Sequence, residues 1–197
     1  EGKIYLTEEE VVDTRTYLLA LAEDLLEDNV DRFAGKELDH EEWDIDALER
    51  EVVRIYGLDQ PQIEGLKLDE KNSDQIGDDL WALIKAGHED REKLVGDEIY
   101  RRVERDIMLQ IVDQQWKDHL YSLDHLKEGI GLRGYGQRDP LVEYKKESFG
   151  LFQDMKARIE EEIVRYLFHL RPVLNEEAAP MPRPARRATP LTMNNPA

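Results

Sequence analysis

The sequence predicts an all-α fold: a long antiparallel helical hairpin, a smaller helical region before it and a Pro-rich, disordered tail after it. Apolar residues recur at three- and four-residue steps along most of the chain, and no segment shows convincing two-residue alternation. From Asp97 to Asp139 there is no proline, as the interior of a long helix requires. Six of the 8 prolines stand at or beyond Pro172, which predicts a linker or disordered end over residues 172–197.

The first expected helix covers residues 8–33. Thr7 and Glu10 have the spacing of a capping box, and a broad apolar stripe follows as far as Gly35. A second, shorter helix is expected directly after Asp44, which can act as its N-cap, and Gly57 should end it. Both helices are amphipathic, so each should bury one face.

Residues 58–72 are expected to form a loop. A third helix should begin at Ser73 or Asp74 and continue to about Leu94, although three glycines make its continuity uncertain. The two tryptophans of this half, Trp43 and Trp81, are expected to anchor the core between small helices rather than to bind a ligand.

Residues 97–128 are dominated by helix-forming residues and predict one helix of about 48 Å at 1.5 Å per residue. Its apolar residues form two stripes whose centres lie roughly 190° apart on a helix. The stripes are Ile99, Val103, Ile107 and Ile111, and then Leu109, Val112, Trp116, Leu120 and Leu123. We therefore expect this helix to be packed on one side near its start and on the other near its end.

The returning helix should start at Asp139-Pro140, a favourable pair for an N-cap and first helical position. Apolar residues then follow at helical steps up to Leu170. Because the connection Ile130–Asp139 is short, the two helices must run antiparallel.

The tip of this hairpin combines many glycines with apolar, aromatic and basic residues. The glycines are Gly129, Gly131, Gly134 and Gly136, and the side chains that could contact a partner are Ile130, Leu132, Arg133, Tyr135, Gln137 and Arg138. One interpretation is that the glycines only reverse the chain. A turn needs only one or two of them, however, and exposed apolar tips usually mark contact with a partner. We favour a contact surface for another polypeptide, centred on Tyr135.

Composition excludes several classes of function. The net charge is −18, and residues 1–96 hold 11 Lys/Arg against 28 Asp/Glu, so bulk binding to nucleic acid is not expected. There is no cysteine, and the sequence contains no run of about 18 apolar residues that would predict a membrane span. The chain begins without Met and enters a helix almost at once, which suggests a segment of a longer protein.

Neither a metal site nor a catalytic site is predicted. His119 and His125 are six residues apart and so point about 240° away from each other on a helix, whereas zinc and iron need convergent ligands. The five histidines, His40, His88, His119, His125 and His169, are expected to lie on surfaces or between helices. Arg101, Arg102 and Arg105 are interpreted as a solvated face paired with Glu98, Glu104 and Asp106.

Several motifs in the hairpin carry a family resemblance. They are W-K-D-H-L at residues 116–120, G-I-x-L-R-G-Y at 129–135, Q-x-D-P at 137–140 and E-Y-K-x-E-S-F at 143–149. This run closely resembles the C-terminal helical scaffold of SecA, the ATP-driven motor family of bacterial preprotein export. The resemblance is clear over residues 97–171 and weaker upstream.

The resemblance implies a division into four parts. Residues 1–38 would be the end of the long scaffold helix, 39–96 the helical wing domain, 97–171 the two-helix finger and 172–197 the C-terminal linker. Tyr135 matches the fingertip tyrosine of the family. The SecYEG channel, the unfolded preprotein and the ATPase core of the same protein are the implied partners, and the implied location is cytoplasmic, peripheral to the inner membrane through the channel.

The departures from the family limit this expectation. No phosphate-binding GxxxxGK[ST] loop is present, so the chain itself should hydrolyse no ATP and need no cofactor, while ATP and Mg would belong to the full-length protein. The Cys-rich zinc tail of the family is missing as well. Two alternatives stay open: a freestanding helical adaptor whose hairpin binds a partner helix, and an acid–base or metal enzyme.

Overall fold

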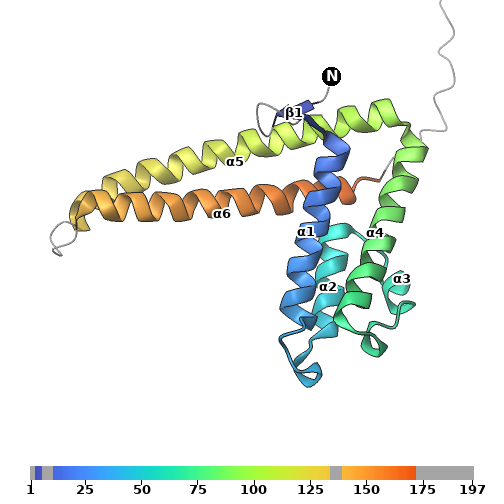
Figure 1. The fold of residues 1–197 in the computed structure, drawn as a ribbon. Coiled ribbons are helices and arrows are strands. Elements are labelled where there is room, and N and C mark those ends of the chain that lie inside the picture. The colour runs from blue at the N-terminus through green and yellow to red at the C-terminus, as the bar shows by residue number, and fades with distance from the viewer. Residues whose placement is uncertain (1–2, 6–10, 134–138, 172–197) are drawn as a thin grey trace, which may run out of the picture.

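The computed structural model describes residues 3–5, 11–133 and 139–171, and it confirms the all-α class. Four helices, α1 (Thr14–Ala34), α2 (Ile45–Tyr56), α3 (Gln60–Glu64) and α4 (Ser73–Val95), form a helical block, residues 14–95. Helices α5 (Asp97–Arg133) and α6 (Pro140–Phe168) form the hairpin, residues 97–168. Figure 1 shows the hairpin extending from the block as a long arm.

The start of α1 differs from the expected helix over residues 8–33. Val11–Asp13 form strand β2, which pairs antiparallel with strand β1 (Lys3–Tyr5), with Ile4 opposite Val12. Helix α1 begins at Thr14 because the Asp13 carboxylate, rather than Thr7, caps it by accepting a hydrogen bond of 3.0 Å from the Thr16 backbone N–H. The helix and its end before Gly35 are otherwise as predicted.

Helix α2 confirms both of its predicted end signals. The Asp44 carboxylate accepts a 2.9 Å hydrogen bond from the Ala47 N–H at the start. At the other end Gly57 adopts φ 61°, and its N–H bonds to the Val53 carbonyl. The His169 ring lies 3.2 Å from where a Cβ at Gly57 would sit, so both the backbone angle and the space favour glycine.

The segment 58–72 is not the plain loop that was expected. It contains α3, with Pro61 in its first turn, and a 3₁₀ turn at Leu68–Glu70, and another 3₁₀ turn lies at His40–Glu42. Ile63 and Leu68 are buried, and their burial in the core explains why the segment folds against it. Helix α4 follows with Asn72 as its N-cap and runs unbroken through Gly77 and Gly87.

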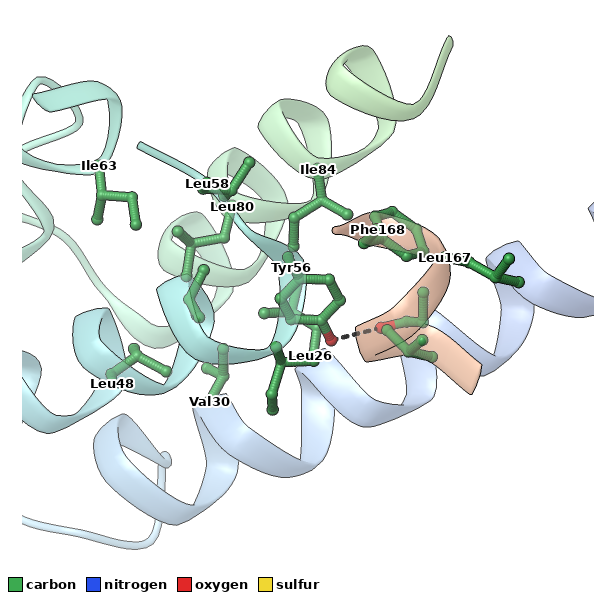
Figure 2. Packing of buried hydrophobic residues seen from close by; sticks show 14 of the residues in the cluster. Leu26, Val30, Leu48, Tyr56, Leu58, Ile63, Leu80, Ile84, Leu167 and Phe168 are labelled. Atoms are coloured by element: carbon green, nitrogen blue, oxygen red, sulfur yellow. Dashed lines mark hydrogen bonds between the residues drawn. The ribbon is translucent and has the colours of Figure 1, made fainter. Parts of the chain in front are cut away.

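The core of the block is shared with the end of the hairpin. Figure 2 shows Tyr56 of α2 at its centre, close to Leu26 of α1, Leu80 of α4 and Phe168 of α6. The Tyr56 hydroxyl donates a 2.8 Å hydrogen bond to the Ala22 carbonyl, and its ring meets the Phe168 ring edge to face at 5.6 Å. Burial raises the pKa of Tyr56 well above its ordinary range. Trp43 and Trp81 pack on the rim of this core, as predicted.

Candidate protein-interaction site on the hairpin

Helices α5 and α6 lie against each other as the short connection predicted, and only their base reaches the helical block (Figure 1). Asp139 caps α6 by accepting a 2.9 Å hydrogen bond from the Leu141 N–H, and Pro140 occupies the first position. At its far end α6 inserts Leu167 and Phe168 into the block. The arm is thus anchored at one end.

Helix α5 buries one continuous line rather than the two opposite stripes that the sequence indicated. Its buried residues follow at steps of three, four and eight, and they are Tyr100, Glu104, Met108, Ile111 and His119. The expectation of two buried stripes is wrong because α5 has one long neighbour, α6, and meets α4 and α1 only near its start. Ile99, assigned to the first stripe, is 59% exposed.

The second predicted stripe is real but lies open on the surface. Leu109, Val112, Trp116 and Leu120 are between 42% and 62% exposed. At 100° per residue these four side chains lie within about 80° of one another on α5. Phe152 of α6 continues this surface, because the His119 ring lies 5.7 Å from the Trp116 ring and 6.0 Å from the Phe152 ring. We call these five residues, Leu109, Val112, Trp116, Leu120 and Phe152, the apolar face of the hairpin.

An elbow between α4 and α5 holds the hairpin to the block. Gly96 turns the chain there with φ 89°, a backbone angle that favours glycine. Inside the elbow, His88 Nε2 lies 3.1 Å from Glu104 Oε1, and both side chains are fully buried. Arg101 bridges the other Glu104 oxygen and Glu92 of α4. These polar side chains join the two elements across the bend.

The same elbow also binds the end of α6. The Arg91 guanidinium donates a 2.7 Å hydrogen bond to the Phe168 carbonyl and lies over the Phe168 ring. Burial lowers the pKa of Arg91 and raises that of the Tyr100 phenol, whose ring meets His88 at 5.4 Å. Three helices therefore converge on this buried polar cluster.

The elbow corrects one interpretation of the sequence. Arg102 is exposed, and Arg101 pairs with the neighbouring carboxylate Glu104, both as expected, but Glu104 is fully buried, so this pair does not belong to a solvated face. The signal that could have revealed this is the position of Glu104 on one helical line with Tyr100, Met108 and Ile111. A carboxylate on such a line has to find a buried partner.

Most of the predicted tip lies outside the described residues. This holds for Gly134, Tyr135, Gly136, Gln137 and Arg138, and for the surroundings of Gly131, Leu132 and Arg133. Ile130 is half-buried in the last turns of α5, and a Cβ at Gly129 would meet no atom within 4 Å. The contact role of the tip stays a prediction. The predicted tail, residues 172–197, also lies outside the described residues.

The histidines take separate positions across the fold. His88 and His119 are buried, the His169 ring contacts the Arg54 carbonyl at 2.9 Å, His40 lies beside Trp43, and His125 is exposed. Within residues 3–5, 11–133 and 139–171, no three His, Asp or Glu side chains gather in a way that could hold a metal ion.

No helix in this part of the chain combines the length and the apolar character that crossing a membrane requires.

Comparison with known proteins assigns the whole described region to one family. The model of the SecA Wing and Scaffold domain matches residues 3–171. The protein translocase subunit SecA of Koribacter versatilis is 45% identical over 165 residues, which are 84% of this chain and 16% of that protein. The SecA of Syntrophobacter fumaroxidans is 42% identical over 153 residues (78% of this chain, 18% of the relative). That of Geobacter metallireducens is 36% identical over 219 residues (98% and 24%).

The chain therefore belongs to the SecA wing and scaffold family. It spans between 16% and 24% of the length of these three relatives.

Proposed function

We propose that this chain is the channel-engaging and regulatory helical part of a SecA-type translocase motor. The hairpin acts as the two-helix finger, and its tip, centred on Tyr135 with Leu132 and Arg133, contacts the translocating polypeptide at the SecYEG channel. Helices α2–α4, within residues 39–96, correspond to the helical wing, and α1 to the end of the long scaffold helix. The motor works at the cytoplasmic side of the inner membrane, bound through the channel.

The observation that carries this proposal is an arm that is fixed at its base and uncovered along its side. Helix α5 has 37 residues, so the hairpin is about 55 Å long. The elbow and the buried end of α6 fix its base, while Trp116 is 46% and Leu109 is 62% exposed. Uncovered apolar surface of this kind marks contact with another protein surface.

The apolar face is proposed to dock on the ATPase core of the same protein. ATP hydrolysis would then take place in the core, where ATP and Mg would bind, and this chain would supply no catalytic residue. Through this contact the position of the finger can bias ATP turnover, because a ligand that favours one finger position also favours the core state bound to it.

The tip is tested in the complete motor by Tyr135→Ala. Translocation of a preprotein into membrane vesicles should fall strongly, while the thermal unfolding of the variant stays unchanged. Tyr121→Ala is a matched control, since Tyr121 is 69% exposed on the shaft of α5. Unaltered transport by Tyr135→Ala would refute the role of the tip.

The apolar face is tested by adding this chain to a motor that lacks it. We expect binding and a changed ATPase rate, with Trp116→Ala weakening binding by about tenfold or more because truncation of a buried Trp anchor costs ~2 kcal/mol. Tyr166→Ala, which removes an exposed aromatic outside the apolar face, serves as control. The absence of both binding and a rate change would count against the regulatory contact.

The same exposed face also fits the second function considered, a freestanding adaptor that binds a partner helix. The experiment above separates the two. An adaptor would bind a helix from another protein through Trp116 and leave the ATPase rate of the core unchanged.

A further inference from the structure

The chain changes direction between α4 and α5 at a single residue, Gly96. Helix α4 ends at Val95 and α5 begins at Asp97, and Figure 1 shows the two helices leaving this bend in different directions. A Cβ placed on Gly96 would meet no atom within 4 Å, so no neighbouring group fixes the bend at that point. The angle between the helices therefore depends on the side chains packed inside the elbow.

The elbow gathers buried polar atoms that lack a hydrogen-bond partner. Among the residues that the structure describes, such atoms belong to Arg15, His88, Arg91 and Tyr100. The last three meet inside the elbow, and Arg15 of α1 lies beside it, 3.2 Å from Glu92 of α4. A buried polar group without a partner costs free energy, because it has given up its hydrogen bonds to water. The closed elbow therefore includes an unfavourable term of its own.

Arg91 makes the largest part of this term. Its side chain is only 7% exposed, and its Nη1 donates to the Phe168 carbonyl while Nε and Nη2 have no acceptor. The side chains that act on its charge are the neutral Tyr100 phenol and the cationic Arg171, and no carboxylate in the described part of the chain pairs with it. Buried cations are normally paired, since desolvation is otherwise uncompensated. Burial accordingly lowers the pKa of Arg91.

Arg101 has the opposite role in the same elbow. Its guanidinium bridges Glu104 and Glu92, and Glu104 also contacts His88. These contacts hold the start of α5 against α4. Arg91, in contrast, is covered by Tyr100 of α5 and by the end of α6, so its charge becomes better solvated when α5 moves away. The elbow thus contains one set of groups that favours closure and another that favours opening.

We propose that the first two turns of α5, residues 97–104, open away from α4 as a conformational device at the base of the hairpin. Arg101 and Glu104 keep the elbow closed, and opening hydrates Arg91 and the Tyr100 hydroxyl. In the open state the hairpin is joined to the block mainly through α6, so its angle to the block can change. This opening does not depend on the tip, the channel or the ATPase core.

Hydrogen exchange of the full chain tests the sign of each effect, with the amides of α2 as a reference for global unfolding. Arg91→Met replaces the unpaired guanidinium with an apolar side chain and should slow exchange at residues 100–104 about tenfold relative to α2. Arg101→Met makes the same chemical change in the same elbow, but it should speed this exchange about tenfold because Glu104 loses its cation. Faster or unchanged exchange in Arg91→Met would overturn the proposal.

Tyr100→Phe gives a second test that does not rely on the folding of Arg91→Met. It keeps the aromatic ring and removes only the hydroxyl, which has no hydrogen-bond partner in the closed elbow. Exchange at residues 101–104 should therefore slow about threefold. Faster exchange would show that the hydroxyl holds the elbow closed and would likewise overturn the proposal.

Spin labels measure the opening directly. The chain has no cysteine, so K85C and R102C place one label each on exposed positions of α4 and α5. In a Glu104→Ala background the distance distribution should broaden towards longer distances, and adding Arg91→Met should narrow it again. A distribution that is the same with and without these two substitutions would mean that the elbow does not open and would overturn the proposal.

Discussion

The helical block and the hairpin are built from the same residue types but treat their apolar side chains differently. In the block, Leu18, Leu48 and Leu80 are fully buried, because α1, α2 and α4 surround a common core that the end of α6 completes. In the hairpin, two helices meet along one seam, and Leu109 and Phe149 are more than 60% exposed. A pair of helices can bury only the facing stripe of each partner.

This difference shows which contacts stabilise each region. The block encloses its core, whereas the outer hairpin depends on its seam and on its anchorage at the base. That anchorage has two parts, the insertion of Phe168 and the buried elbow around Glu104. The four predictions that follow test this contrast, beginning with the variant expected to be most damaging.

Phe168→Ala should destabilise the chain by about 3–5 kcal/mol, the usual cost of truncating a fully buried Phe. The ring contacts Tyr56 and His88, so both the core and the elbow lose a neighbour. Urea unfolding followed by far-ultraviolet circular dichroism measures the effect. Tyr166→Ala, two residues earlier and 54% exposed, should cost less than about 1 kcal/mol. Similar costs for the two variants would mean that α6 is not anchored through Phe168.

Glu104→Ala should cost about 3 kcal/mol, because it leaves Arg101 and the buried His88 without their shared partner. The control is Asp106→Ala, which removes an exposed carboxylate two residues further along the same helix, on its opposite side. Hydrogen exchange should also show faster opening at the start of α5, around residues 97–104. If the two variants unfold at the same urea concentration, the elbow does not stabilise the junction.

Asp13→Ala should destabilise α1 by about 1 kcal/mol through loss of its N-cap. Hydrogen bonds from the backbone and side chain of Thr16 hold the Asp13 pKa below its ordinary value of 3.8. A lowered folded-state pKa means that this stabilisation is complete above pH 3.8 and is lost as pH falls through the folded pKa. The difference in the free energy of unfolding between wild type and variant should therefore disappear in acid. If this difference stayed constant down to pH 2, the Asp13 carboxylate would not stabilise α1 as its N-cap.

Leu109→Ala should change stability by less than about 0.5 kcal/mol, since the side chain is already mostly in water. Leu80→Ala in the block, with the same chemical change at a fully buried site, should cost about 3–5 kcal/mol. The pair measures the contrast between the two regions directly. A large cost at Leu109 would show that the isolated chain already covers the apolar face, for example by self-association.

Several helix ends were predicted correctly from signals that act within a few residues. Asp44, Gly57 and Asp139-Pro140 all stand where helices begin or end, because caps and turns depend on local backbone geometry. The start of α1 was missed because residues 11–13 pair with β1 instead of continuing the helix, and strands of three residues leave a weak local pattern. The sequence showed the apolar stripe from Leu109 to Leu120, but it did not show that this stripe is exposed.

The sequence by itself determined an all-α chain with a long hairpin, since helical period and proline placement depend on neighbours along the chain. Its motifs also indicated the family that comparison then confirmed. Only the tertiary structure decided which stripe of α5 is buried, that Glu104 joins His88 inside an elbow, and that Arg91 is buried in the same elbow. The physical reason is that periodicity shows that a face is apolar, whereas burial depends on which other element packs against it.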